Sequence, residues 1–337
     1  MKRPFHLLLV ALLFAVVGCN DETVEKADQN QINFQALLGK QTRATETTVT
    51  SLQTASATTA IPVEAYKAED NSPWNTFNLV YGTNWTHSTP VYAPTFALNY
   101  YSWYPTAIVD DTFENNDGEV TFEYTVATTA AAQEDLIVAS ALNQTVATIP
   151  LTFSHILSQV NFAIQGVAGI KVEITNISLN KIASTSTFTY PATWATPTGQ
   201  ANYAYDPVGT TNKTDGVATT IQHMGNKGGT EQTDNNNANA LMLMPQTFGD
   251  DTSTFTFDFS LTNIDNEALA SGTGTGVLEE LDVTTWLPGK RYLYVIDFTG
   301  YLVNKLINFT VAVAPWEDGD PTTPVKPTPL QIGRAHV

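Results

Sequence analysis

One cysteine closes a short apolar segment near the N-terminus, where its thiol could be acylated. Cys19 is the single cysteine of the chain and ends the sequence VVGC. It follows the basic pair Lys2 and Arg3 and the apolar stretch Leu7–Val17, which is short for a membrane span. This pattern matches a bacterial lipobox, so we expect residues 1–18 to be a signal peptide and lipid on Cys19 to hold the protein in the outer membrane. The alternative is an ordinary cleaved signal peptide followed by a free thiol.

A lone arginine follows a strand-like segment soon after this cysteine. Apolar residues alternate with other residues at Ile32, Phe34, Ala36 and Leu38, as in a strand with one buried face. Arg43 comes next, and a threonine-rich stretch begins at Ala44. The other arginines are Arg3 in the signal peptide, Arg291 in a predicted strand and Arg334 at the C-terminal end. We therefore expect Arg43 to be the accessible arginine, with an ordinary solvated linker residue as the alternative.

Side chains that could perform catalysis are scattered along the chain. The five histidines lie far apart, and the sequence contains no HExxH, GxSxG or Walker motif. His155 adjoins a predicted buried strand, which favours a structural role over a catalytic one. The glycine-rich GTGTG at Gly272–Gly276 does not join a strand to a helix, so we expect a flexible hairpin turn there. The sequence thus predicts no catalytic residue, no cofactor and no enzyme.

Two acidic segments contain ligands that calcium prefers. They are Glu114, Asp117 and Glu119, and Glu317, Asp318 and Asp320. Neither segment has the alternating spacing of an EF-hand loop. We interpret both as solvated turns and predict no metal site.

A run of aromatic residues, NYYSWYP at Asn99–Pro105, could stack on sugar rings. Alternation along a strand places Tyr101 and Trp103 on one face and Tyr100 and Tyr104 on the other. We therefore expect at least half of these rings to be buried. Tyr101 and Trp103 are the candidates for contact with a glycan.

The composition favours β-structure and excludes nucleic acid as a partner. The net charge is −18, and only 14% of residues are charged. Phosphate binding requires clustered lysine and arginine, and no basic stripe is present. Threonine, valine and aromatic residues, which suit pleated and half-buried surfaces, are abundant.

Alternating segments separated by turn residues predict an all-β protein. The clearest are Glu119–Val126, Gln159–Gly166, Thr254–Leu261 and Ile307–Val313. A seven-stranded antiparallel sandwich takes about 100 residues, so the length favours two in tandem. We place a propeptide at 19–43, the first sandwich at 44–149, the second at 150–319 and a tail at 320–337. The boundary is expected near Ile149–Pro150.

The predicted tail is rich in proline and ends in an unusual sequence. Residues Asp320–Pro329 contain prolines that cannot donate ladder hydrogen bonds. The last six residues, Ile332–Val337, match the translation of a common sequencing adapter. We expect them to be read-through rather than natural sequence.

Several motifs in order resemble one family of surface proteins. They are the lipobox, FALNYYSWYP, LTFSHILSQVNFAI, LMLMPQTF, WLPGKRYLYVIDF and VAPWEDG, which together extend from Cys19 to Gly319. In order and spacing they resemble the fimbrillin-like subunits of type V pili in Gram-negative gut and oral anaerobes. The segment Thr196–Asn239 contributes no motif to the match.

The resemblance implies a fold and a route of assembly. It implies two tandem transthyretin-like β-sandwiches, export as a lipoprotein, and cleavage at the cell surface by an arginine-specific protease. Cleavage between Arg43 and Ala44 would release the strand formed by Ile32, Phe34, Ala36 and Leu38. A strand from another fimbrial subunit would then fill the groove, in a structural role in adhesion and biofilm formation.

The C-terminal region departs from the pattern of a stalk subunit. After Trp316 no alternating apolar run follows, and Val325, Leu330 and Ile332 are spaced among prolines. A subunit that accepts a strand and donates none would end a fibre, which favours a tip position; a truncated stalk subunit is the alternative. The alternative function is a monomeric glycan-binding surface lipoprotein that keeps its N-terminal strand.

Overall fold

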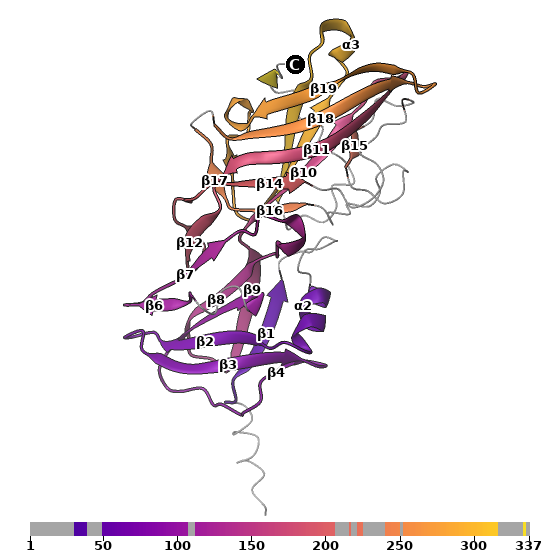
Figure 1. The fold of residues 1–337 in the computed structure, drawn as a ribbon. Helices are drawn as coiled ribbons and strands as arrows, with labels where there is room; N and C mark the ends of the chain where they lie inside the picture. The colour runs from indigo at the N-terminus through magenta and orange to yellow at the C-terminus, as the bar shows by residue number, and fades with distance from the viewer. Residues whose placement is uncertain are drawn as a thin grey trace, which may run out of the picture.

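Nearly all of the regular secondary structure in the described chain is β-strand, as the sequence predicts. The computed structural model describes residues 30–38, 49–106, 112–205, 216, 221–224, 240–249, 252–315 and 333–334. The N-terminal sheet lies at the bottom of Figure 1 and the C-terminal sheets at the top. Two hydrophobic cores correspond to these two parts of the molecule.

The N-terminal part is a seven-stranded sheet built around one core. Its strands, in spatial order, are β1 (Asn33–Leu38), β9 (Thr148–His155), β8 (Ile137–Gln144), β5 (Leu98–Tyr104), β2 (Ile61–Lys67), β3 (Pro73–Tyr81) and β4 (Trp85–Thr86). Helix α2 (Val49–Ser56) buries Leu52 in the same core. All described pairings within this sheet are antiparallel except β1 with β9, which is parallel.

The C-terminal part consists of two main sheets that enclose the larger core. One contains β10 (Ser158–Gln165), β15 (Ile221–His223), β16 (Leu241–Leu243), β21 (Lys290–Asp297), β22 (Asn308–Pro315) and β23 (Gly333–Arg334). The other contains β14 (Ala201–Tyr205), β11 (Ile170–Ile182), β18 (Thr254–Asn263) and β19 (Ala268–Val277). The rings of Phe162 in β10 and Phe255 in β18 lie 5.6 Å apart across the sandwich. β10 and β21 pair in parallel, which antiparallel sandwiches do not predict.

Several short elements lie outside these sheets. Two further strands, β17 (Gln246–Thr247) and β20 (Thr285–Trp286), pair with each other. Helix α3 (Tyr301–Asn304) and two 3-10 turns, η2 (Ala130–Ala132) and η3 (Leu278–Glu280), lie between strands.

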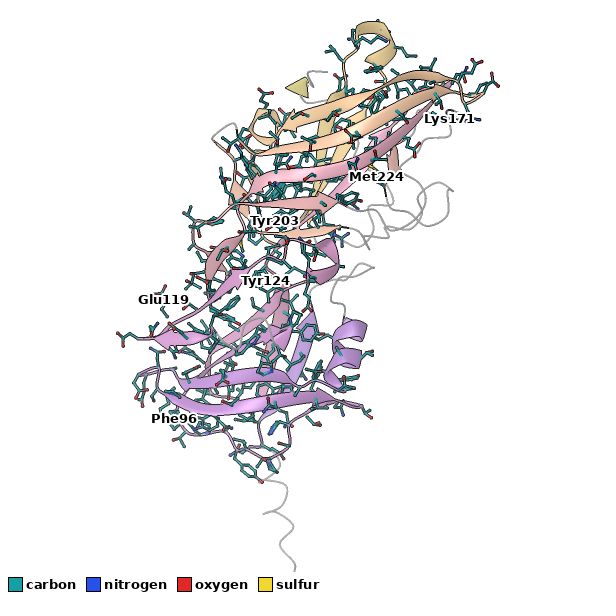
Figure 2. The ribbon with its side chains drawn as sticks, viewed as in Figure 1. Phe96, Glu119, Tyr124, Lys171, Tyr203 and Met224 are labelled. Carbon is teal, nitrogen blue, oxygen red and sulfur yellow. The ribbon has the colours of Figure 1, made fainter. Side chains whose placement is uncertain are left out.

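A fourth, smaller sheet joins the two parts of the molecule. It contains β6 (Glu114–Asn116), β7 (Glu119–Thr125), β12 (Thr185–Thr189) and β13 (Thr193–Trp194). The β7–β12 ladder pairs residues from both predicted domains. Tyr124 of β7 and Tyr203 of β14 lie at this junction, and both belong to the larger core (Figure 2).

The position of β9 disagrees with the predicted boundary at Ile149–Pro150. That boundary falls inside β9, whose residues Ile149, Leu151 and Phe153 are buried in the first core. The next buried residues, Ile156 and Leu157, belong to the larger core. The change from the first core to the larger core therefore follows His155. Pro150 does not end β9, because its side chain lies on the exposed face of the strand.

The glycine-rich GTGTG forms part of a strand, so the prediction of a hairpin turn there was wrong. Gly272–Gly276 lie within β19 and pair with β18. A β-carbon on Gly274 would lie 2.3 Å from the ring of Phe257, and one on Gly276 would lie 2.3 Å from the ring of Phe255. The glycines are required because the phenylalanine rings of the neighbouring strand occupy the space where side chains would be.

We expect Gly274→Ala to lower the free energy of unfolding by about 1–3 kcal/mol, because the added methyl group overpacks this contact. Denaturant unfolding followed by far-UV circular dichroism measures the change. Gly82→Ala is the matched control, since nothing lies within 4 Å of a β-carbon there. Equal stability of the two variants would contradict the packing explanation.

Candidate functional site

The strand β1 is attached at the edge of the first sheet by a parallel ladder. The ladder pairs Asn33 with Thr148 and continues to Leu38, which pairs with Phe153. The predicted strand at Ile32–Leu38 is therefore present, although its pairing is parallel. Six ladder positions and the residues just before them hold this segment against the rest of the sheet.

The start of this segment is also bonded on its second edge. The backbone N–H of Ile32 donates to the carbonyl of Val91 at 2.8 Å, and that of Ala93 donates to the carbonyl of Asn30 at 2.8 Å. The Nε2 atom of His87 lies 2.9 Å from the carbonyl oxygen of Ile32. Because a carbonyl can only accept, Nε2 must carry the proton. Residues 87–93 thus form a clasp over the beginning of β1, and we call them the clasp.

Three alternating side chains of the segment fill the first core. Ile32, Phe34 and Ala36 are 0%, 4% and 8% exposed, whereas Asn33 and Gln35 between them are exposed. The predicted buried face is confirmed at these three positions; the side chain of Leu38 lies outside the described residues. The segment therefore acts as an inserted part of the core rather than as a surface strand.

Phe34 sits in a box of rings. Its centroid lies 5.0 Å from that of Phe77, 5.7 Å from that of Tyr100 and 6.1 Å from that of His87, all in edge-type geometry. His87 in turn lies 5.1 Å from Phe77. Burial raises the pKa of the Tyr100 phenol, so this wall of the box stays neutral.

The role of His87 in this site could not be found from the sequence. Among scattered histidines it carries no motif, and its contacts with Phe34 and Ile32 come from residues far away in the chain. Only the pairing of the clasp with the residues just before β1 would have indicated it. Such a long-range pairing has no local sequence signal.

Three predicted processing positions fall outside the described residues. These are the lipidation site Cys19 and the cleavage pair Arg43 and Ala44. They lie before β1 and between β1 and α2, respectively. Arg291, by contrast, lies in β21, a central strand paired with both β10 and β22, as expected for an arginine protected from proteolysis.

The predicted sugar-contacting pair is part of the hydrophobic core, which corrects that expectation. Tyr101 and Trp103 are 6% and 2% exposed. Trp103 stacks on Phe113 at 4.3 Å, and Tyr101 meets Tyr190 at 5.1 Å. The central strand β5 is covered on both faces, because the joining sheet packs over the face opposite Tyr100. Neither ring offers a face on which a sugar could stack.

His155 has a structural partner, as its position beside a buried strand suggested. His155 Nδ1 lies 2.9 Å from Asp135 Oδ1, and their side chains are 8% and 1% exposed. Across the described ranges, no group of three histidine, cysteine or acidic residues is arranged to hold a metal. The helices in those ranges are too short or too polar to cross a membrane.

We expect Phe34→Ala in the full chain to lower the free energy of unfolding by about 3–5 kcal/mol, the usual cost of deleting a buried ring. Gln35→Ala, on the exposed face of the same strand, should change it by less than about 0.5 kcal/mol. Guanidinium titration of both variants compares them directly. Similar losses for the two would show that the strand is not part of the core.

Solved structures with a similar chain path are distant in sequence. A candidate cell adhesion protein from Bacteroides uniformis is 13% identical, with a TM-score of 0.47 over 85% of this chain and 98% of that one. A second, from Bacteroides ovatus, is 12% identical, with a TM-score of 0.47 over 87% and 99%. The tip fimbrial protein Mfa3 from Porphyromonas gingivalis is 11% identical, with a TM-score of 0.38 over 83% and 99%.

Family membership rests on a sequence profile. No curated protein sequence matches this chain. The model of the fimbrillin-like family, however, matches residues 42–316, which include the joining sheet and the residues of both cores that follow β1. The chain therefore belongs to the fimbrillin-like family.

Proposed function

We propose that this protein is a structural subunit of a surface fimbrium that acts in adhesion and biofilm formation. It is exported as a lipoprotein anchored in the outer membrane through Cys19. An arginine-specific protease then cuts between Arg43 and Ala44, and β1 is replaced by a strand from another fimbrial subunit. Family membership supports the fimbrial role, and the placement of β1 is the observation that supports the assembly route.

The energetics of β1 are suited to exchange. Burial of Ile32 and Phe34 contributes about 1.5–3 kcal/mol each, which is a large share of the roughly 5–15 kcal/mol that stabilises a domain. Loss of β1 would expose the backbone edge of β9 and an apolar groove, and such an edge readily pairs with another strand. A groove vacated by β1 would therefore favour rapid binding of another strand.

The location of the cut explains how β1 could leave. Before cleavage, β1 is tied to α2 by residues 39–48, so its effective concentration at the groove is high. Cleavage at Arg43 ends that tether, and rebinding of β1 then depends on its free concentration. Helix α2 remains with the mature protein, held by the buried side chain of Leu52.

The proline-rich segment after β22 supports a tip position, with a truncated stalk subunit as the alternative. Strand β22 ends at Pro315, and the segment after it contains prolines where a donor strand would need backbone N–H groups. This segment is therefore unsuited to act as a donor strand. The glycan-binding alternative has lost its main support, because Tyr101 and Trp103 are buried.

We expect Arg43→Ala to block assembly, because the tether between β1 and α2 then stays intact. The variant should accumulate as lipid-anchored full-length protein and be absent from detergent-resistant ladders. Mass spectrometry of the N-terminus and gel analysis of sheared fibres measure the two effects.

Lys40→Ala is the matched control, since it removes a neighbouring basic residue and leaves the arginine in place. It should be processed to an N-terminus at Ala44 and should assemble normally. Ladders formed by the Arg43→Ala subunit would contradict the cleavage model.

A tip subunit should be present only at fibre ends. Immunogold labelling of an epitope tag in the exposed turn after β18, at Asp265–Glu267, is expected to mark one end of each fibre. Label spaced regularly along the shaft would instead identify a stalk subunit.

A further inference from the structure

We infer that the groove now occupied by β1 selects a replacement strand that has an aromatic side chain at the position of Phe34. His87 is the residue that recognises this side chain by contact with its ring. The partner is an uncharged segment of another polypeptide with the spacing aliphatic–x–aromatic–x–small. This inference rests on the proposed exchange of β1, and it specifies the chemistry of the strand that takes part.

The aromatic box supplies the side-chain selectivity. Phe77, Tyr100 and His87 all present edge-type contacts to Phe34, at interplanar angles of 67°, 81° and 79°. Such contacts pair the positive edge of one ring with the negative face of another. A leucine at this position could fill much of the volume but could make none of these contacts. Ring geometry, rather than hydrophobicity alone, therefore distinguishes possible strands.

His87 couples this side-chain site to the backbone. The same imidazole that meets the Phe34 ring donates a hydrogen bond to the carbonyl of Ile32, two residues earlier. A strand shifted by one residue would present its other face to the groove and would lose the aromatic contact. His87 therefore fixes register and side-chain identity together.

The size requirements differ along the groove. Ile32 is fully buried under the clasp, and Ala36 is 8% exposed two positions beyond Phe34. The pattern is large aliphatic, then aromatic, then small. No Asp, Glu, Lys or Arg occurs between Ser72 and Val109, the stretch that supplies the box and the clasp. An uncharged partner suits this lining, because burying an unpaired charge there would be unfavourable.

The chain repeats the aliphatic and aromatic positions of this spacing in its last long strand, with Val311 in place of the small residue. The sequence leading into β1 reads Ile32-Asn33-Phe34-Gln35-Ala36, and the sequence leading into β22 reads Ile307-Asn308-Phe309-Thr310-Val311. Phe309 is 2% exposed, and its ring centroid lies 4.9 Å from that of Phe255 in β18 of the facing sheet. The spacing therefore belongs to strands that bury an aromatic ring beside another, and it provides a second peptide with which to test the groove.

The first experiment measures strand entry in the full chain after cutting at Arg43 with an arginine-specific protease. Fluorescent nine-residue peptides with the sequence of Asn30–Leu38 are added, and binding is followed by anisotropy. Phe34→Tyr should bind comparably to the native peptide and Phe34→Leu about tenfold more weakly, as expected for loss of aromatic contacts. Gln35→Ala is the matched control and should bind like the native peptide. A Phe34→Leu peptide that binds as tightly as the native one overturns the inference.

A peptide with the sequence Ile307–Val313 and the substitution Val311→Ala, which gives it the full spacing, tests whether spacing is sufficient. It should enter the cut protein, and its Phe309→Leu variant should bind about tenfold more weakly for the same reason. Failure of this peptide where the native peptide binds would show that the spacing does not define the partner. Failure of every peptide would contradict the proposed exchange, whereas selectivity for the aromatic is tested separately in the uncut chain.

The second experiment uses the uncut chain, so that its outcome does not depend on exchange. Phe34→Leu should lower the thermal midpoint more than Ile32→Leu does. In a His87→Gln background, which can keep a hydrogen-bond donor but removes the ring, the effect of Phe34→Leu should shrink. Thr86→Ala, an exposed neighbour, is the control background. An unchanged effect in His87→Gln would overturn the assignment of His87.

Discussion

The first core depends on β1, the strand that precedes helix α2 in the chain. Without β1, the edge of β9 and the aromatic box around Phe77 would face water, since Ile32, Phe34 and Ala36 are what cover them. The ladder with β9 supplies backbone hydrogen bonds along one edge, and the clasp supplies them along the other edge at the start. This arrangement makes the domain complete only while the site is filled.

The two parts of the molecule are less separate than a tandem arrangement would suggest. β5 contributes Tyr100 to the first core and Tyr101 to the larger one, and the β7–β12 ladder joins segments about 60 residues apart. Tyr190 also donates a hydrogen bond to the carbonyl of Ser102 at 2.9 Å. The joining sheet therefore covers the face of the first sheet opposite the first core, while β1 pairs at the edge of that sheet beside β9.

Local patterns predicted the strands well, and long-range packing accounts for what they missed. The face formed by Phe255, Phe257, Phe259 and Leu261 is buried as alternation predicts. Alternation could not reveal that both faces of β5 are covered, because the second cover comes from β7 and β12. It also could not distinguish a glycine turn from a glycine strand, since the reason for the glycines is the pair of rings on β18. The strand-like segment Ile32–Leu38 was visible as a pattern, but its parallel pairing and its contact with His87 were not.

Parallel pairing of β1 with β9 has a consequence for the shape of an assembly. In a parallel ladder the inserted strand has one direction relative to its host, so a replacement in the same register enters with the same sense at every junction. Contacts of this kind are heterologous: the surface that donates the strand differs from the surface that receives it, and repetition produces an open chain where the rotation between subunits does not close a ring. A filament built through this site would therefore have two unlike ends, one presenting an unfilled groove until a strand arrives and the other a subunit whose groove is already occupied.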